Sequence, residues 1–104
     1  MKNLKLKLIR QKIDKLDDKL LNLIKIRTNL VTGVLKQKRY KNQIIDKARI
    51  KEVLTLIKKK SISRKIDPKI TKKIWKNIIR AYIDFEKRNF KKKYFKYNYV
   101  GEIL

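Results

Sequence analysis

The fold of this chain is decided by residues 3–38, which read NLKLKLIRQKIDKLDDKLLNLIKIRTNLVTGVLKQK. Apolar residues recur there at spacings of three and four, which indicates a helix with one core-facing stripe. The members of this stripe are Leu4, Leu8, Ile13, Leu16, Leu20, Leu23, Ile24, Leu30, Val31 and Val34. The pattern predicts one helix from Asn3 to about Arg39 or Tyr40, and at ~1.5 Å per residue it exceeds ~50 Å in length.

A second, shorter helix is expected after an irregular stretch. Residues 41–45 break the periodicity, and Asp46 then suits an N-cap. Residues 58–61, KKKS, close this helix with cations, which are favourable at a helix C-terminus. Its apolar positions are Ile50, Val53, Leu54 and Ile57.

The third expected helix begins with Asp67 and Pro68, an N-cap followed by proline at the first helical position, and reaches Phe90 or beyond. Glycine occurs only at Gly33 and Gly101, and proline only once. So few breakers in a periodic chain indicate an all-α fold.

The long helix cannot bury its apolar stripe against two shorter helices alone. A second copy of the chain would cover it, so we expect an interlocked homodimer in which the long helices lie against each other. A chain of 104 residues forms one domain. We assign residues 1–90 to this three-helix protomer and residues 91–104 to a basic, aromatic C-terminal tail.

The charge of the chain is strongly positive, with 32 Lys+Arg against 9 Asp+Glu and a formal net charge of +23. Such an excess is typical of proteins that bind nucleic acid or an anionic membrane surface. The lysines are spread through every segment, however, so we interpret most of them as a solvated surface. Residues 39–41 and 88–99 interleave cations with aromatics, which leaves a nucleic-acid-binding helical module as a less favoured alternative. A structural coiled-coil dimer is a further alternative, but it would not need the two later helices.

Cysteine and histidine are both absent. This composition excludes disulfides, the usual zinc sites, thiol nucleophiles and the most common general base. No apolar run approaches the ~18 residues of a membrane span, and the N-terminus lacks a signal-peptide pattern. We therefore expect a cytoplasmic protein with no metal, no cofactor and no membrane partner.

Several cations fall at positions that suit a shared anion. Arg27 and Lys38 are eleven residues apart, which on one continuous helix leaves ~20° of angular offset and ~16 Å of separation. Arg10 lies ~25 Å before Arg27, so it can share a small ligand with Arg27 only across an antiparallel helix pair. Tyr82 and Glu86 share one face of the third helix. We expect the anion to be a small dicarboxylate.

The order and spacing of several short segments can be compared with those of known protein families. The segments are residues 9–21, IRQKIDKLDDKLL; Ile26-Arg27 followed by Lys38; Asp46 and Arg49; and residues 66–68, IDP, leading to Ile78-Ile79. In the order and spacing of these segments the chain resembles the all-helical chorismate mutases (the AroQ class) over about residues 4–90.

The resemblance implies an interlocked dimer with two sites, each of which receives Arg10 from the partner subunit. It implies that Arg10 and Arg27 clamp the two carboxylates of chorismate and that Lys38 donates to the ether oxygen. Arg49 would support the pocket, and the backbone at Asp46 would contact the substrate hydroxyl. The rearrangement of chorismate to prephenate needs no nucleophile, metal or general base, which fits a chain without cysteine or histidine.

Three positions depart from the mutase pattern. Ile50 stands where glutamate is common, and Tyr82 stands where a small hydroxyl residue is common. Both changes look more like isochorismate-pyruvate lyase, the salicylate-forming relative, so chorismate mutase is our first hypothesis, the lyase is the second, and dual activity stays open. Glu86 stands where glutamine is usual in both families. To donate a hydrogen bond to the ether oxygen Glu86 must be protonated, so we expect activity to rise toward acidic pH and Glu86→Gln to flatten that profile.

Overall fold

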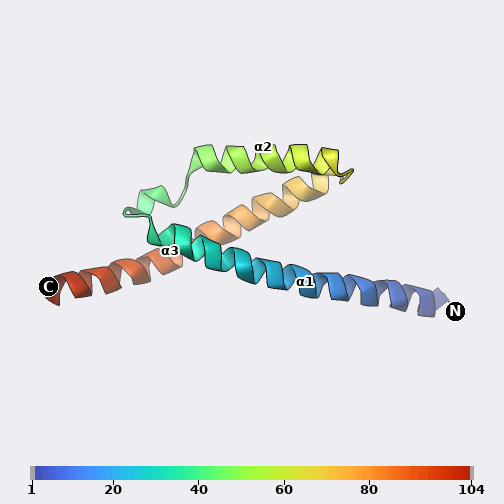
Figure 1. The fold of residues 1–104 in the computed structure, drawn as a ribbon, viewed down its shortest axis with the longest axis horizontal. Coiled ribbons are helices and arrows are strands. Elements are labelled where there is room, and N and C mark those ends of the chain that lie inside the picture. The colour runs from blue at the N-terminus through green and yellow to red at the C-terminus, as the bar shows by residue number, and fades with distance from the viewer. Residues whose placement is uncertain (1, 104) are drawn as a thin grey trace. The chain divides into compact units, whose positions relative to one another are not determined.

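A computed structural model of the protein describes the backbone of residues 2–103 and the side chains of residues 3–90. The chain runs through α1 (Lys2–Lys36), the short 3-10 helix η1 (Lys41–Gln43), α2 (Lys47–Ser63) and α3 (Pro68–Ile103), as Figure 1 shows. The described residues contain no strand, so the predicted all-α class is confirmed. None of the described helices has both the length and the apolar character needed to cross a membrane.

The chain divides into two compact units, and the boundary between Thr32 and Gly33 falls inside α1. The first unit is helical throughout its described residues. Near its end the hydroxyl of Thr28 donates to the carbonyl of Ile24 at 2.8 Å, and that of Thr32 donates to the carbonyl of Thr28 at 3.0 Å. A Cβ added at Gly33 would have no neighbouring atom within 4 Å in the described part of the chain, apart from the backbone of its own helix. Packing therefore does not require glycine at this position.

The end of α1 differs from the sequence-based prediction. The helix ends at Lys36 rather than at Arg39 or Tyr40. The side chain of Gln43 explains the difference, because its Oε1 accepts from the backbone N–H of Arg39 at 2.7 Å and of Tyr40 at 2.9 Å. Amides that bond to a side chain cannot bond to the carbonyl four residues earlier, so the helix stops. Lys38 consequently lies beyond α1, and the continuous helical spacing that we assumed for it is wrong.

The starts of α2 and α3 agree with the prediction. Oδ1 of Asp46 accepts from the backbone N–H of Arg49 at 3.0 Å, as an N-cap does. Oδ1 of Asp67 accepts from the backbone N–H of Lys69 at 2.9 Å, and Pro68 is the first residue of α3. The backbone of α3 continues to Ile103, so the segment that we predicted as a tail extends the helix, while its side chains lie outside the described residues.

The turn between α2 and α3 is held by two hydroxyl groups. Ser61 Oγ donates to the carbonyl of Ile57 at 2.6 Å and lies 2.7 Å from Oγ1 of Thr71, and both hydroxyl residues are buried. α2 runs to Ser63, two residues further than predicted. Lys65 then adopts a φ of 57°, a left-handed conformation that costs an L-residue roughly 1–2 kcal/mol.

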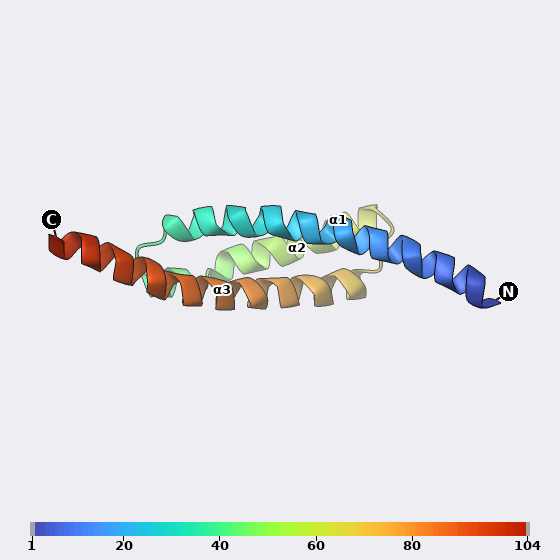
Figure 2. The ribbon, with the colours of Figure 1, turned by 90° about the horizontal axis from the view of Figure 1, so that it is seen from below.

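The buried residues lie in the second unit. Leu35, Ile44 and Phe90 form its apolar core, and Ile83 packs against them. α2 packs along α3, and Figure 2 shows the two helices side by side. The predicted apolar face of α2 is half-buried in this packing, whereas Ile70 and Ile74 near the start of α3 are exposed.

The apolar stripe of α1 is largely exposed in the single chain. Every side chain from Asn3 to Ile26 is exposed. Leu16, Leu20 and Leu23, for example, expose 57%, 53% and 59% of their surface. The homodimer that we expect to cover this stripe stays a prediction.

Candidate active site

An ion pair between the half-buried Lys38 and the buried Glu86 joins the segment after α1 to α3. Nζ of Lys38 lies 2.9 Å from Oε1 of Glu86, with 17% and 9% of the two side chains exposed. The same Nζ donates to the carbonyl of Ile44 at 3.4 Å. Two acceptors therefore fix the position of the ammonium group, and the limited access of water strengthens its field.

The apolar core of the second unit contributes directly to this pair. Ile44 is itself one of the core residues, beside Leu35 and Phe90. Ile44 thus supplies both an apolar side chain and the carbonyl that accepts from Lys38. Because removal of one partner of a buried pair leaves an uncompensated charge, Lys38 and Glu86 depend on each other.

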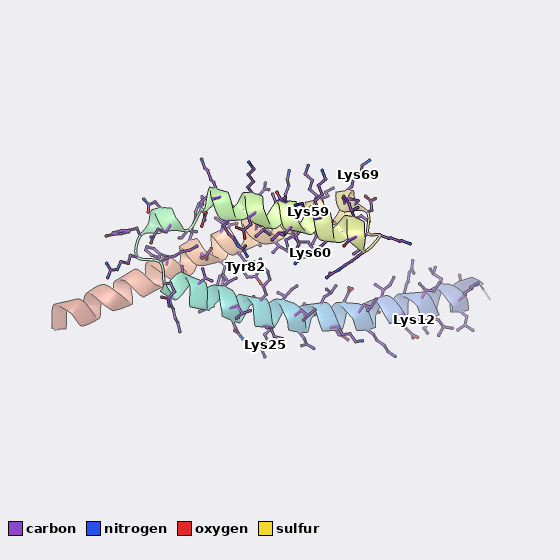
Figure 3. The ribbon with its side chains drawn as sticks, turned by 45° about the horizontal axis from the view of Figure 1, so that its top comes forward. Lys12, Lys25, Lys59, Lys60, Lys69 and Tyr82 are labelled. Carbon is purple, nitrogen blue, oxygen red and sulfur yellow. The ribbon has the colours of Figure 1, made fainter. Side chains whose placement is uncertain are left out.

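Tyr82 lies one helical turn before Glu86 on α3, as the sequence predicted, and Figure 3 shows it projecting from the middle of that helix. It is half-buried. Its ring meets that of Phe85 edge to face, with centroids 6.2 Å apart and an interplanar angle of 83°. This arrangement fits an aromatic wall next to Glu86 better than an exposed tyrosine.

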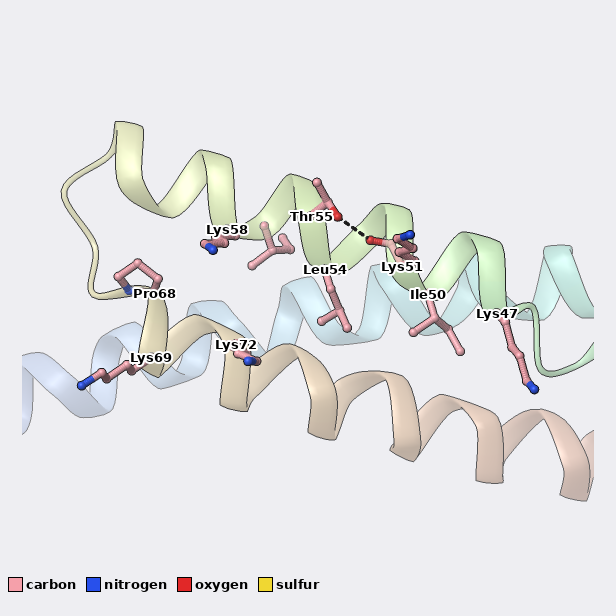
Figure 4. A pocket seen from close by; sticks show the side chains of 10 residues that line it. Lys47, Ile50, Lys51, Leu54, Thr55, Lys58, Pro68, Lys69 and Lys72 are labelled. Carbon is pink, nitrogen blue, oxygen red and sulfur yellow. Dashed lines mark hydrogen bonds between the residues drawn. The ribbon is translucent and has the colours of Figure 1, made fainter.

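The predicted site residues at the start of α2 are less enclosed. Arg49 is exposed, and its Nη1 forms an ion pair with Glu52. Asp46 is exposed, and its carboxylate caps the helix. Ile50 is half-buried and points from α2 toward α3, where it lines a groove (Figure 4). The structure thus joins Asp46 to Arg49 through the cap and Lys38 to Glu86 through the ion pair.

Arg10 and Arg27 belong to the first unit, whereas the other candidate residues belong to the second. Arg10 is exposed and lines a shallow surface hollow of α1 together with Asp14. Arg27 is half-buried, and its Nη1 atom is shielded from solvent. The proposed contact of Arg10 with the site of a second copy stays a prediction.

Sequence reasoning missed two residues that shape the site. Gln43 ends α1 and so sets where Lys38 emerges, and Ile44 accepts from Lys38. The sequence feature that could have indicated a buried residue here is the apolar pair Ile44-Ile45, which lies in a stretch that breaks the helical pattern. Ile44 is buried and Ile45 is exposed, so the apolar pair alone does not tell which of its two residues packs into the core.

Fold and site together define a class: an all-α protein in which a lysine and a buried carboxyl meet where helical segments converge. The comparison with protein families specifies the class further, because residues 9–87 match the family Chorismate mutase type II. The chain belongs to this family, as the resemblance predicted. The matched range contains every candidate site residue from Arg10 to Glu86. Family membership supports a chorismate mutase-type isomerase that acts on a chorismate-type small molecule. Comparisons with curated proteins and with solved structures found no match.

Proposed function

We propose that this protein is a chorismate mutase that converts chorismate to prephenate in active sites shared between two subunits. The family match over residues 9–87 carries the proposal. The buried contact between Lys38 and Glu86 supports it, because both residues fall where the resemblance places the groups that face the ether oxygen.

The chemistry suits the residues of this chain. In the rearrangement the ether C–O bond breaks while a C–C bond forms, and no atom enters or leaves. Negative charge grows on the ether oxygen, and the Lys38 ammonium would stabilise it. An ammonium carries three N–H groups, so a bond to Glu86 is compatible with a bond to substrate. Such a fixed donor is worth roughly 10²–10³ in kcat.

The arginines would hold the two carboxylates of the substrate. Arg27 and Arg10 of the partner subunit would each bind one carboxylate by paired, charge-assisted hydrogen bonds. Arg49 would turn from Glu52 toward the pocket. Because an exposed ion pair contributes only ~0–1 kcal/mol, this exchange costs little.

The homodimer is part of the proposal, since one site needs Arg10 from a second copy. The exposed apolar stripe of α1 supports it, because extended apolar patches on a soluble chain mark interaction surfaces. Sedimentation equilibrium at micromolar concentration should give twice the chain mass. A folded, active species with the mass of one chain would contradict the shared site.

We propose that Glu86 donates to the ether oxygen in a protonated form, which would replace the ion pair that the structure shows with Lys38. If so, the wild-type rate falls as pH rises, because the donor form is lost, and Glu86→Gln keeps its rate from pH 5 to pH 8. In the alternative role Glu86 is a carboxylate that only orients Lys38. A wild-type rate that does not vary over this range would exclude the donor role.

The decisive assay offers purified protein chorismate and isochorismate separately and measures prephenate and salicylate. Lys38→Ala and Arg27→Ala should each lower prephenate formation about 100-fold or more. Lys59→Ala, an exposed change on α2, is the matched control and should keep the wild-type rate. Turnover that survives both site variants, or no turnover of either substrate by the wild type, would contradict the proposal.

Isochorismate-pyruvate lyase is the second candidate, and Ile50 and Tyr82 favour it. Ile50 is half-buried and apolar, so it cannot accept a hydrogen bond from the ring hydroxyl that glutamate would bind in a mutase. Salicylate and pyruvate formed from isochorismate, at a rate that exceeds prephenate formation from chorismate, would make the lyase the main activity. Ile50→Glu should then shift the balance toward prephenate.

A further inference from the structure

One face of α3 carries a row of cations that the proposed active site does not use. Residues 69, 73, 76, 80 and 87 follow one another at spacings of four, three, four and seven, which keeps them on one line of a helix. At ~100° per residue they fall within an arc of ~60°, and along the axis they extend over ~27 Å. We call this line the α3 cation row; its members are Lys69, Lys73, Lys76, Arg80 and Lys87.

All five side chains of the α3 cation row are exposed. Figure 4 shows the first of them, Lys69, pointing away from the start of α3. The ion pairs found among the described residues, Lys38–Glu86 and Arg49–Glu52, include no member of the row. The charges of the row are therefore available to an external anion.

The row differs from the lysines of α1. Over residues 12–19 of α1, exposed lysines alternate with exposed aspartates. The described part of α3 contains two acidic residues, of which Glu86 is buried against Lys38 and Asp84 lies at one edge of the row. Like charges four residues apart destabilise a helix. The row is therefore unfavourable by itself, and a polyanion that covers it would relieve the repulsion.

We propose that the α3 cation row binds the phosphate backbone of a nucleic acid. Lysine ammonium groups contact phosphate oxygens as compact point charges, and an arginine adds a planar donor to the same line. A straight row of cations meets successive phosphates of one strand, and each contact releases a condensed counterion. Contacts to phosphates read no base, so this binding is independent of nucleotide sequence.

The row is separate from the proposed active site on the same helix. Tyr82 and Glu86 lie ~80° or more around α3 from every member of the row. Substitutions in the row should therefore leave turnover of chorismate unchanged. Nucleic-acid binding and the proposed function can thus be tested independently.

A nucleic acid fits the row better than an anionic membrane does. A helix that lies in a membrane surface carries large apolar side chains beside its cations along its whole length. On the described part of α3 the exposed large apolar side chains are Ile70 and Ile74. Both occur in the first two turns, whereas the row continues to Lys87. Most of the row thus offers charge without an apolar face to insert.

The continuation of α3 supports the same partner. The backbone stays helical beyond Phe90 to Ile103. The sequence of residues 91–99, KKKYFKYNY, adds four lysines and four aromatic residues, with no acidic residue among them. Cations interleaved with aromatics are the residue types that hold phosphates and stack on the bases of a single strand. The row therefore leads into a segment of matching composition.

The test removes charge from the middle of the row. The row variant is Lys73→Gln with Lys76→Gln and Arg80→Gln, and the probe is a fluorescent oligothymidylate of ~20 nucleotides. Fluorescence anisotropy at several salt concentrations measures the dissociation constant and its salt dependence. At about 0.1 M salt the dissociation constant of the row variant should rise at least about tenfold. The slope of log K against log salt should become shallower by about 2, because each lost phosphate contact removes ~0.7.

The matched control is Lys25→Gln with Lys59→Gln and Arg64→Gln. It also removes two lysines and one arginine from exposed positions, but none of them lies on α3. Its dissociation constant should change less than about threefold, since salt screens charges that do not contact the strand. A second variant, Lys73→Arg with Lys76→Arg, keeps the charge of the row and should bind as the wild type does.

Three results would overturn the proposal. The first is a wild type that does not bind the oligonucleotide at about 0.1 M salt. The second is equal weakening in the row and control variants, which would indicate attraction by the overall charge. The third is a row variant that keeps oligonucleotide binding but no longer binds phosphatidylglycerol vesicles, which would assign the row to a membrane. Circular dichroism and chorismate turnover of the row variant should match those of the wild type.

Discussion

Residues 3–32 and residues 33–90 carry the same kind of apolar periodicity but differ in burial. In the first region every side chain up to Ile26 is exposed, whereas the buried residues of the described chain, from Leu35 to Phe90, all lie in the second. The comparison shows that periodicity identifies the apolar face of a helix without identifying what covers it. In the second region α2 packs against α3. For the first region, we propose that a second copy of the chain provides the cover.

The two regions should therefore respond differently to mutation. An isolated helix is marginal in water, because nucleation is costly and packing supplies most of its stability. We expect the first region to gain its stability from dimer formation. The second region should retain structure of its own, since it has a core, a buried ion pair and two capped helices.

The largest effect is expected for Leu20→Asp in the first region. Loss of the leucine contact and burial of a carboxylate together cost on the order of 5 kcal/mol, which should abolish dimerisation at micromolar concentration. Asn22→Asp, on the opposite face of the same helix, adds the same group and should leave the dimer intact. Sedimentation velocity measures both. If the Leu20→Asp chain still dimerised, the apolar stripe of the first region would not be the dimer contact.

Phe90→Ala in the second region should lower the free energy of unfolding by about 3–5 kcal/mol, because it empties part of the core formed with Leu35 and Ile44. Urea unfolding followed through the fluorescence of Trp75, the single tryptophan, reports on this region. The exposed change Lys87→Ala should have little effect. Equal stability of the two variants would show that the second region has no core of its own.

Asp46→Ala should destabilise α2 by about 1 kcal/mol, because the amide of Arg49 loses its capping carboxylate. Asp46→Asn retains an oxygen acceptor and should recover most of the loss. Thermal unfolding monitored by circular dichroism compares the stability of the wild type, Asp46→Ala and Asp46→Asn. A change as large as that of Phe90→Ala would mean that Asp46 does more than cap the helix.

The smallest effect is expected at Lys65, and it should be a gain. Glycine adopts the left-handed conformation without the clash of a Cβ but loses more backbone entropy, so Lys65→Gly should stabilise the second region by about 0.5 kcal/mol. Lys65→Ala keeps the Cβ and should give no gain. Stabilisation by alanine alone would indicate that the charge of Lys65, rather than its backbone, is unfavourable.

The helices themselves were predictable because their signals are local. Asp46 and Asp67 were assigned as N-caps from sequence, and both cap helices in the structure. The end of α1 was not predictable, because it depends on Gln43, whose side chain competes for backbone amides that a helical pattern assigns to the helix. A backbone N–H can donate either to a helical carbonyl or to a side chain, so the residue at which a helix ends is hard to locate from sequence.

The candidate site was predictable only in part. Tyr82 and Glu86 share a helix, so their spacing follows from sequence alone. The approach of Lys38 to Glu86 spans 48 residues and depends on how the irregular segment folds, and only the resemblance to a family suggested it. The contact of Arg10 with another subunit involves a second chain, so neither periodicity nor spacing within one chain can establish it.

Gly33 has a consequence for the local stability of α1. Nothing packed beside it demands a missing side chain, and in a helix glycine costs ~1 kcal/mol relative to alanine. The residue therefore lowers the local stability of α1 at the boundary between the two units. Gly33→Ala should therefore strengthen the helix at this position without a steric clash.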